Sequence, residues 1–194
     1  MHNEDKRQLV HLTMVVFALL LRWFEQWQQQ WLAIVLAGGA VLFNLFILRH
    51  LAPALFRERE HQKGYSIGII IYPLVVLILV IVFPLYIAAG AWAILAIGDS
   101  LSNLIGRRFG SRKLYWNPVK SYAGLIAFIV PSIIGSGFFL WWVKPDIAIR
   151  ELVNLAVSGS VVSGILETLP VKLDDNILVG LGGGLSLYLL SLLY

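Results

Sequence analysis

The chain has 194 residues, of which 59% are hydrophobic and 13% charged, and its formal net charge is +4 at pH 7. This composition is typical of a membrane protein, in which basic residues first mark cytoplasmic loops and contacts with lipid headgroups, so we expect no nucleic-acid partner. The absence of cysteine excludes disulfides, thiolate metal sites and cysteine nucleophiles.

Apolar runs separated by charged breaks predict the membrane-spanning helices, because about 20 apolar residues cross the hydrocarbon core of a bilayer. We predict seven such helices: Leu9–Phe24, Trp31–Leu48, Tyr65–Phe83, Leu85–Ile105, Tyr122–Val143, Leu152–Glu167 and Ile177–Leu193. The expected fold is therefore all-α, a polytopic integral membrane bundle formed by a single domain over residues 1–194. The first run lacks a small-residue cleavage site, so we expect it to remain in the mature protein.

The distribution of basic residues predicts a cytoplasmic N-terminus. In that orientation, 12 of the 15 Lys and Arg residues fall on the cytoplasmic side, in residues 1–8, 49–64, 99–121 and 168–176. The positive-inside rule favours this arrangement. We expect a prokaryotic cell membrane with the active site at its cytoplasmic face.

Asp99 lies inside the fourth predicted span, where an ionised carboxylate must face a polar cavity or a cation. Asn103 follows four residues later and shares its helical face. Oxygen ligands of this kind suit magnesium, which is usually bound by one or two carboxylates together with substrate phosphates. The alternative is an aspartate that pairs with an arginine for a purely structural reason.

Basic residues and glycines follow this span, at Arg107, Arg108 and Gly110, and continue to Lys120 and Ser121 at the predicted start of the fifth helix. Free backbone amides and the positive end of a helix dipole favour a phosphate there, and a lysine adds a point charge. Basic loops are also ordinary topology signals. The proximity of Asp99 favours the phosphate site.

A third polar segment connects the sixth and seventh predicted helices, with Glu167 followed by Asp174, Asp175 and Asn176. The predicted topology puts it on the same side as Asp99 and Lys120. Acidic and basic residues fit together at one site if the carboxylates bind a divalent metal ion, the metal ion also binds a polyphosphate, and the basic residues bind the remaining phosphate charge. The two aspartates also fit a helix N-cap, and the two roles can coexist.

A smaller polar patch lies at the start of the first predicted helix, where Arg7 and His11 share a face. Either an interfacial position or contact with a substrate explains it. No Walker A loop, dinucleotide-binding glycine motif or hydrolase triad is visible in the sequence.

Together these motifs resemble the membrane polyprenol kinase family, which includes dolichol kinases and phytol kinases and transfers phosphate from CTP, or in some members another nucleotide, to a lipid alcohol. The resemblance rests on Gly98-Asp99, Gly106-Arg107-Arg108-Phe109-Gly110, Lys120-Ser121-Tyr122-Ala123-Gly124, Glu167-Thr168-Leu169-Pro170 and Asp174-Asp175-Asn176, with Glu4, Arg7, His11 and the segment Gly68 to Leu74 in support. The later motifs look closest to the phytol kinase branch. Gln8, Ser102, Val119 and Ala123 depart from the family pattern.

The resemblance implies a CTP-dependent kinase that phosphorylates a long-chain isoprenoid alcohol, such as phytol, geranylgeraniol, dolichol or another polyprenol, with Mg²⁺ as cofactor. It implies catalytic roles for Asp99, Lys120, Glu167 and Asp175, and metal ligands among Asp99, Asn103, Asp174 and Asp175. The implied nucleotide and phosphate contacts are Arg107, Arg108, Gly110, Lys120, Ser121 and Gly124, with further contributions from Arg7, His11 and Asn176.

Other functions stay open. The pattern is also similar to that of phosphatidate cytidylyltransferases, which attach a nucleotide to a phospholipid, and a diacylglycerol kinase is a further alternative. A transporter or membrane scaffold is the non-enzymatic alternative. The expected partners are CTP or another nucleoside triphosphate, a lipid alcohol and membrane lipids, and the sequence leaves self-association open.

Overall fold

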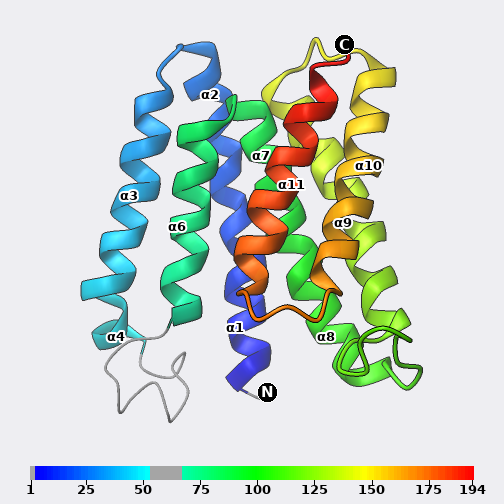
Figure 1. Ribbon diagram of the computed structural model, residues 1–194. Helices are drawn as coiled ribbons and strands as arrows, with labels where there is room; N and C mark the ends of the chain where they lie inside the picture. Colours follow the sequence, from blue (N-terminus) through cyan, green and yellow to red (C-terminus); the bar gives the residue numbers. More distant parts are fainter. Residues whose placement is uncertain (1–2, 53–66) are drawn as a thin grey trace.

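The protein is a bundle of helices that run roughly parallel to one another (Figure 1). The computed structural model describes residues 3–52 and 67–194, and this described part contains helices and no strands. The predicted all-α class is therefore confirmed for these residues. The N-terminus lies at one end of the bundle and the C-terminus at the other.

An N-terminal helical rod is formed by α1 (Asn3–Thr13), a 3-10 segment (Met14–Leu20) and α2 (Leu21–Gln26). A tight turn, in which Gln28 has φ 54°, reverses the chain into α3 (Gln30–Phe46), and the short α4 (Leu48–Leu51) follows. The Gln30 side chain donates a hydrogen bond of 2.7 Å to the Val80 carbonyl and so ties the start of α3 to the neighbouring helix.

The centre of the bundle is a continuous rod. It follows α6 (Ile67–Val82) and consists of α7 (Leu85–Ala93), one π-helical turn (Ile94–Asp99) and α8 (Ser100–Phe109). The α7 sequence is apolar on all sides, as expected for a helix surrounded by others. Its π-helical turn ends at Asp99, and such turns are frequent at functional sites.

Three further helices pack around this rod: α9 (Tyr122–Val143), α10 (Ile149–Glu167) and α11 (Asp175–Ser191). Small residues allow the close approach of α10 and α11, since a Cβ atom added to Gly183 would lie 2.6 Å from Ser163 Oγ. Glycine therefore serves close helix packing here, as expected between helices in a bilayer.

A helix occurs at each of the seven predicted ranges within the described residues. In the part of the chain that the structure describes, four helical stretches are long and apolar enough to cross a membrane: Asp5–Gln26, Leu85–Phe109, Tyr122–Val143 and Ile149–Glu167. Gln30–Phe46 and Gly68–Val82 are apolar but shorter. Seven membrane crossings and a cytoplasmic N-terminus therefore stay predictions, and most of the basic segment 49–64 lies outside the described residues.

Candidate functional site

Asp99 stands at the junction of the π-helical turn and α8, where its side chain is buried. Asn103, one turn later, donates hydrogen bonds of 3.0 Å from its side-chain amide to both the Asp99 carboxylate and the Asp99 carbonyl. The predicted pairing of these two residues on one helical face is thus present.

Glu167 reaches the same region from the C-terminal end of α10. Its side chain is 3% exposed, and its Oε1 atom accepts a hydrogen bond of 3.0 Å from Ser102 Oγ of α8. The next residue, Thr168, is clamped by the loop before α9, since Trp116 donates to its hydroxyl and Asn117 to its carbonyl. These contacts bind the end of α10 to the loop that carries Lys120.

Lys120 joins two of the acidic residues. Its Nζ atom lies 2.6 Å from Glu167 Oε1 and 2.9 Å from Asp175 Oδ2. Burial by itself lowers the pKa of this ammonium group, but the Glu167 and Asp175 carboxylates outweigh the burial and raise the pKa above its usual value. Lys120 is therefore a fixed positive charge at neutral pH.

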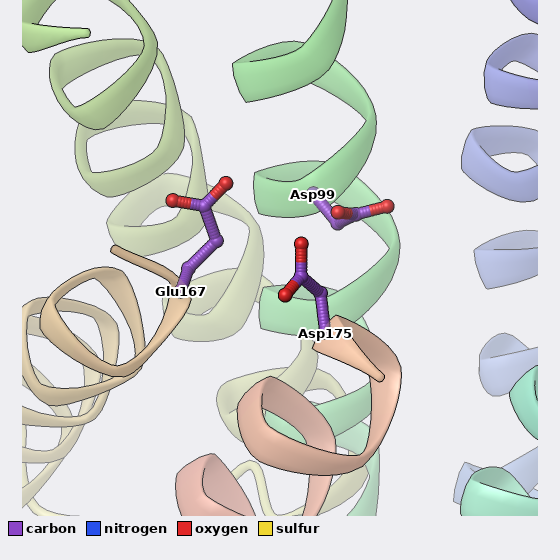
Figure 2. A group of neighbouring side chains, drawn as sticks. All are labelled: Asp99, Glu167 and Asp175. Carbon is purple, nitrogen blue, oxygen red and sulfur yellow. The ribbon is translucent and has the colours of Figure 1, made fainter. Parts of the chain in front are cut away.

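Asp99, Glu167 and Asp175 form a carboxylate cluster in which one oxygen of each residue lies within 4.8 Å of one oxygen of each of the others. Figure 2 shows their side chains converging from three different helices. Oxygen donors at this separation are the ligand type that Mg²⁺ prefers. The donor set fits such an ion, and in the structure the single Lys120 ammonium pairs with two of the three carboxylates, Glu167 and Asp175.

Asp174 caps helix α11. Its Oδ1 atom accepts hydrogen bonds from the Asn176 backbone amide at 3.0 Å and from the Asn176 side-chain amide at 2.8 Å. The capping role that the sequence allowed is thus present. Glu167, rather than Asp174, joins Asp99 and Asp175 in the carboxylate cluster, while a ligand role for Asp174 stays a prediction.

A cavity of about 920 Å³ opens beside the cluster. Its mouth is polar and is lined by Arg7, Gln8, His11, Asp99, Asn103, Asp174, Asp175 and Asn176. From there the cavity continues between the N-terminal rod, α3 and α6, with a lining of apolar side chains that extends to Phe24, Ala33 and Val80. A ligand with one polar end and one long apolar part matches this lining.

The mouth holds buried polar atoms without hydrogen-bond partners in the described part of the protein. They are Gln8 Oε1, His11 Nε2 and Asn176 Oδ1. Buried polar groups are usually paired, and an unpaired one costs about 1–3 kcal/mol. A polar ligand in the mouth would satisfy these atoms.

The two arginines predicted to contact phosphate bind another residue in this structure and do not line the cavity. Arg107 and Arg108, in the last turn of α8, bind the Asp5 carboxylate of α1 at 2.9 and 3.2 Å. Both side chains are largely exposed, and neither lines the cavity. Their predicted contact with phosphate would require them to leave Asp5 or to share it with a ligand.

Gly110, Ser121 and Gly124 form a tight junction between α8 and α9. Ser121 caps α9, because its Oγ atom accepts a hydrogen bond of 3.2 Å from the Gly124 amide. A Cβ atom on Gly110 would lie 2.1 Å from the Gly106 carbonyl oxygen and 2.4 Å from Ser121 Oγ. The structure therefore gives these residues a packing role, and their predicted phosphate contacts stay predictions.

Several residues of the site were not predicted to belong to it, although Ser102 was noted as a departure from the family pattern and Tyr72 lies in the supporting segment Gly68 to Leu74. Ser102 contacts Glu167, and its position one turn after Asp99 was the available signal. Tyr72 and Trp92 line the mouth with His11: the Tyr72 and His11 rings lie 3.8 Å apart, and Trp92 Nε1 donates to the Tyr72 hydroxyl at 2.7 Å. No sequence motif marks the partnership of these aromatic residues. The side chain of Glu4, part of the family pattern, lies outside the described residues.

Comparisons with known proteins point to one kind of enzyme. The chain is 35% identical over 154 residues to a probable chloroplastic phytol kinase of Triticum aestivum, a match that covers 72% of this chain and 49% of that protein. It is 33% identical over 98 residues to the chloroplastic phytol kinase 1 of Arabidopsis thaliana, covering 47% of this chain and 32% of the relative. With the chloroplastic farnesol kinase of Arabidopsis thaliana it shares 30% identity over 101 residues, covering 50% and 33%.

The chain spans about half the length, or less, of these curated relatives. No protein-family model matches the sequence, and no solved structure matches it. The matches to phytol kinases and to a farnesol kinase nevertheless confirm the resemblance drawn from the motifs: over the matched stretches this chain is similar to kinases of isoprenoid alcohols.

Proposed function

We propose that the chain is a CTP-dependent kinase that phosphorylates a long-chain isoprenoid alcohol at the cytoplasmic face of a membrane. Relatives named phytol kinase and farnesol kinase support an isoprenoid alcohol as the acceptor and a nucleotide as the donor. The choice of CTP rests on the motif resemblance, and the membrane face rests on the distribution of basic residues. A prokaryotic cell membrane stays an expectation, whereas the relatives reported above are chloroplastic.

One observation carries the proposal: the carboxylate cluster lies at the polar mouth of a long apolar cavity. A lipid alcohol has a single hydroxyl at the end of a hydrocarbon chain. Bound with its tail along the apolar part, it presents that hydroxyl to Asp99 and Asp175, which both line the mouth. A small water-soluble acceptor has no long apolar part that could contact the apolar lining of the cavity.

The residues present suggest how the reaction is assisted. The alcohol oxygen attacks the γ-phosphorus of CTP, a bond forms between them, and the bond from the γ-phosphorus to the bridging oxygen breaks, so that CDP leaves. The hydroxyl proton passes to a carboxylate. Of the described residues, Asp99 and Asp175 line the cavity but Glu167 does not, so we assign proton acceptance to one of the two aspartates.

Glu167 and Lys120 then serve the donor side. Lys120 is held by Glu167 and Asp175 and supplies a positive charge close to the transferred phosphoryl group. Asp99, Glu167 and Asp175, with Asn103 beside them, would hold Mg²⁺, which neutralises charge on the phosphates of a nucleotide. Arg107 and Arg108 stay candidates for the outer phosphates.

The test is transfer from CTP labelled separately on its α and γ phosphates, with purified protein and phytol, farnesol or geranylgeraniol as acceptor. We expect label from the γ position in the lipid, dependence on Mg²⁺, and loss of transfer in Asp99→Asn. Asp146→Asn, a change of the same chemistry at an exposed residue in the α9–α10 connection, should retain transfer.

The same experiment separates the alternatives. Label from the α position in a phospholipid acceptor, with release of pyrophosphate, would identify a cytidylyltransferase. Transfer to diacylglycerol but to no isoprenoid alcohol would identify a diacylglycerol kinase. Absence of transfer from CTP and from ATP to all of these acceptors would overturn the kinase and favour a transporter or scaffold.

A further inference from the structure

The cavity has a closed end opposite its polar mouth. Leu21 and Phe24 of α2, Ala33 of α3 and Val80 of α6 line this end, and each of the four is at most 9% exposed. The hydrogen bond from Gln30 to the Val80 carbonyl ties α3 to α6 just beyond Ala33. The end is therefore built from side chains held on three helices.

The side of the cavity next to α3 is different. Val35, Leu36 and Phe43 of α3 and Phe17 of the N-terminal rod line the cavity and are between 39% and 62% exposed. Exposed apolar side chains on a helix bundle of this composition face lipid. This side offers a lipid tail a way in from the bilayer, whereas the far end does not offer a way out.

The length of the cavity, from its polar mouth to its closed end, can be estimated along the N-terminal rod. Along the N-terminal rod, 13 positions separate the mouth residue His11 from the end residue Phe24, which is roughly 23 Å at 1.5 Å per α-helical residue and 2.0 Å per residue of the 3-10 segment. An alcohol with its hydroxyl beside Asp99 can extend its tail over this length before it meets Phe24. A longer tail must either bend out of the cavity through the open side next to α3 or pull the hydroxyl away from Asp99.

We propose that the closed end, formed by Leu21, Phe24, Ala33 and Val80, is a stop that sets the longest isoprenoid tail able to lie extended in the cavity, so that alcohols with longer tails react less efficiently. This inference rests on the proposed function. Hydrocarbon gains little free energy when it moves from lipid into an equally apolar groove. The preference therefore comes from steric exclusion of longer tails and not from better filling by shorter ones.

The adjacent glycines of α3 provide a matched pair of variants. A Cβ atom added to Gly38 or to Gly39 meets no other atom within 4 Å, so either position accepts a larger side chain. Gly39 lines the cavity and Gly38 does not. Gly39→Leu should narrow the cavity partway along its length, and Gly38→Leu should leave it unchanged while making the same change in helix propensity.

Phe24→Ala is the converse variant, because it removes the largest side chain at the closed end. The experiment offers purified full-length protein an equimolar mixture of farnesol, geranylgeraniol and a longer polyprenol with labelled CTP. The readout is the ratio of kcat/KM for the longer alcohols to that for farnesol. A ratio within one protein sample does not depend on how much of that sample is folded.

We expect Phe24→Ala to raise this ratio, and Gly39→Leu to lower it, each by about tenfold or more. Gly38→Leu should match the unmodified protein. Unchanged ratios in both Phe24→Ala and Gly39→Leu, or a shift in Gly38→Leu equal to that in Gly39→Leu, would overturn the stop while leaving the kinase intact. A failure of the unmodified protein to phosphorylate any of the alcohols would instead overturn the proposed function.

Discussion

Lys120 Nζ and Glu167 Oε1 lie 2.6 Å apart, although 47 positions separate the two residues in the chain. The pair joins the loop before α9 to the last residue of α10, and Asp175 of α11 binds the same ammonium group. Three segments therefore meet through one lysine. Its removal would affect both the chemistry of the site and the assembly of this end of the bundle.

Lys120→Met should abolish phosphoryl transfer and lower stability, because, of the hydrogen-bond partners that the described residues give the buried Glu167 carboxylate, it leaves only the Ser102 hydroxyl. Removal of one partner of a buried ion pair typically costs about 3–5 kcal/mol, because the remaining charge stays buried without its counter-charge. Thermal unfolding in detergent and transfer from labelled CTP are the two measurements. Lys113→Met, which removes an exposed lysine in the same loop, is the control and should change neither quantity. Full activity of Lys120→Met would contradict the assigned role.

The pH dependence of stability follows from the same pair. Glu167 and Asp175 raise the pKa of Lys120 in the folded state. The ion pairs of Lys120 therefore contribute their full stabilisation below the unfolded pKa of lysine, about 10.4. This stabilisation is lost as the pH rises through the folded-state pKa. The unfolding midpoint of the unmodified protein should therefore fall more steeply above about pH 10.4 than that of Lys120→Met. Parallel curves for the two proteins would show that the pair does not couple to folding.

Mg²⁺ should stabilise the protein in the absence of nucleotide if Asp99, Glu167 and Asp175 bind it. A ligand at a hundred times its dissociation constant stabilises the folded state by about 2.7 kcal/mol. The measurement is the unfolding midpoint during a Mg²⁺ titration, with excess EDTA as the reversal. Asp99→Asn should lose most of the increase, and Asp146→Asn should keep it. An equal increase in both variants would place the metal elsewhere.

Arg107 and Arg108 bind Asp5, and variants of the two sides of this contact can distinguish a structural role of the arginines from a role in binding phosphate. If the arginines only dock α8 against α1, then Asp5→Asn and the double change Arg107→Ala with Arg108→Ala should have the same small effect, about 0–1 kcal/mol for exposed pairs. If they bind nucleotide, only the double change should raise the KM for CTP, by about tenfold or more for lost charge-assisted contacts. We expect the second outcome, measured by steady-state kinetics with CTP as the varied substrate.

The positions of the helices could be predicted well from the sequence, and the contacts between them could not. Tyr122–Val143 was predicted with the bounds that the structure has, because charged or polar residues border a run that is mostly apolar and contains no charged residue. Asp99, Lys120, Glu167 and Asp175 could be assigned to one end of the bundle because the chain crosses back and forth between predictable breaks. Topology alone brings such residues to the same side.

Which atoms meet at that end depends on the rotation of each helix about its axis, and apolar runs do not encode this rotation clearly. The sequence therefore did not predict that Ser102 contacts Glu167 or that Asp5 binds the two arginines. The cavity could not be predicted from the sequence either, because its walls come from the N-terminal rod, α3 and α6 together. Its opening beside Asp99 is the fact that most constrains the function.

Gly110→Ala should destabilise the junction between α8 and α9 because the new methyl group would meet the Gly106 carbonyl oxygen at 2.1 Å and Ser121 Oγ at 2.4 Å. The first of these atoms belongs to the backbone, so a side-chain rotation cannot relieve the contact. Overpacking of this kind typically costs about 1–3 kcal/mol. Gly38→Ala is the matched control, since its methyl group would meet open space, and it should be neutral or slightly stabilising. Thermal unfolding of both variants in the same detergent tests the difference, and equal midpoints would show that the junction is looser than the structure indicates.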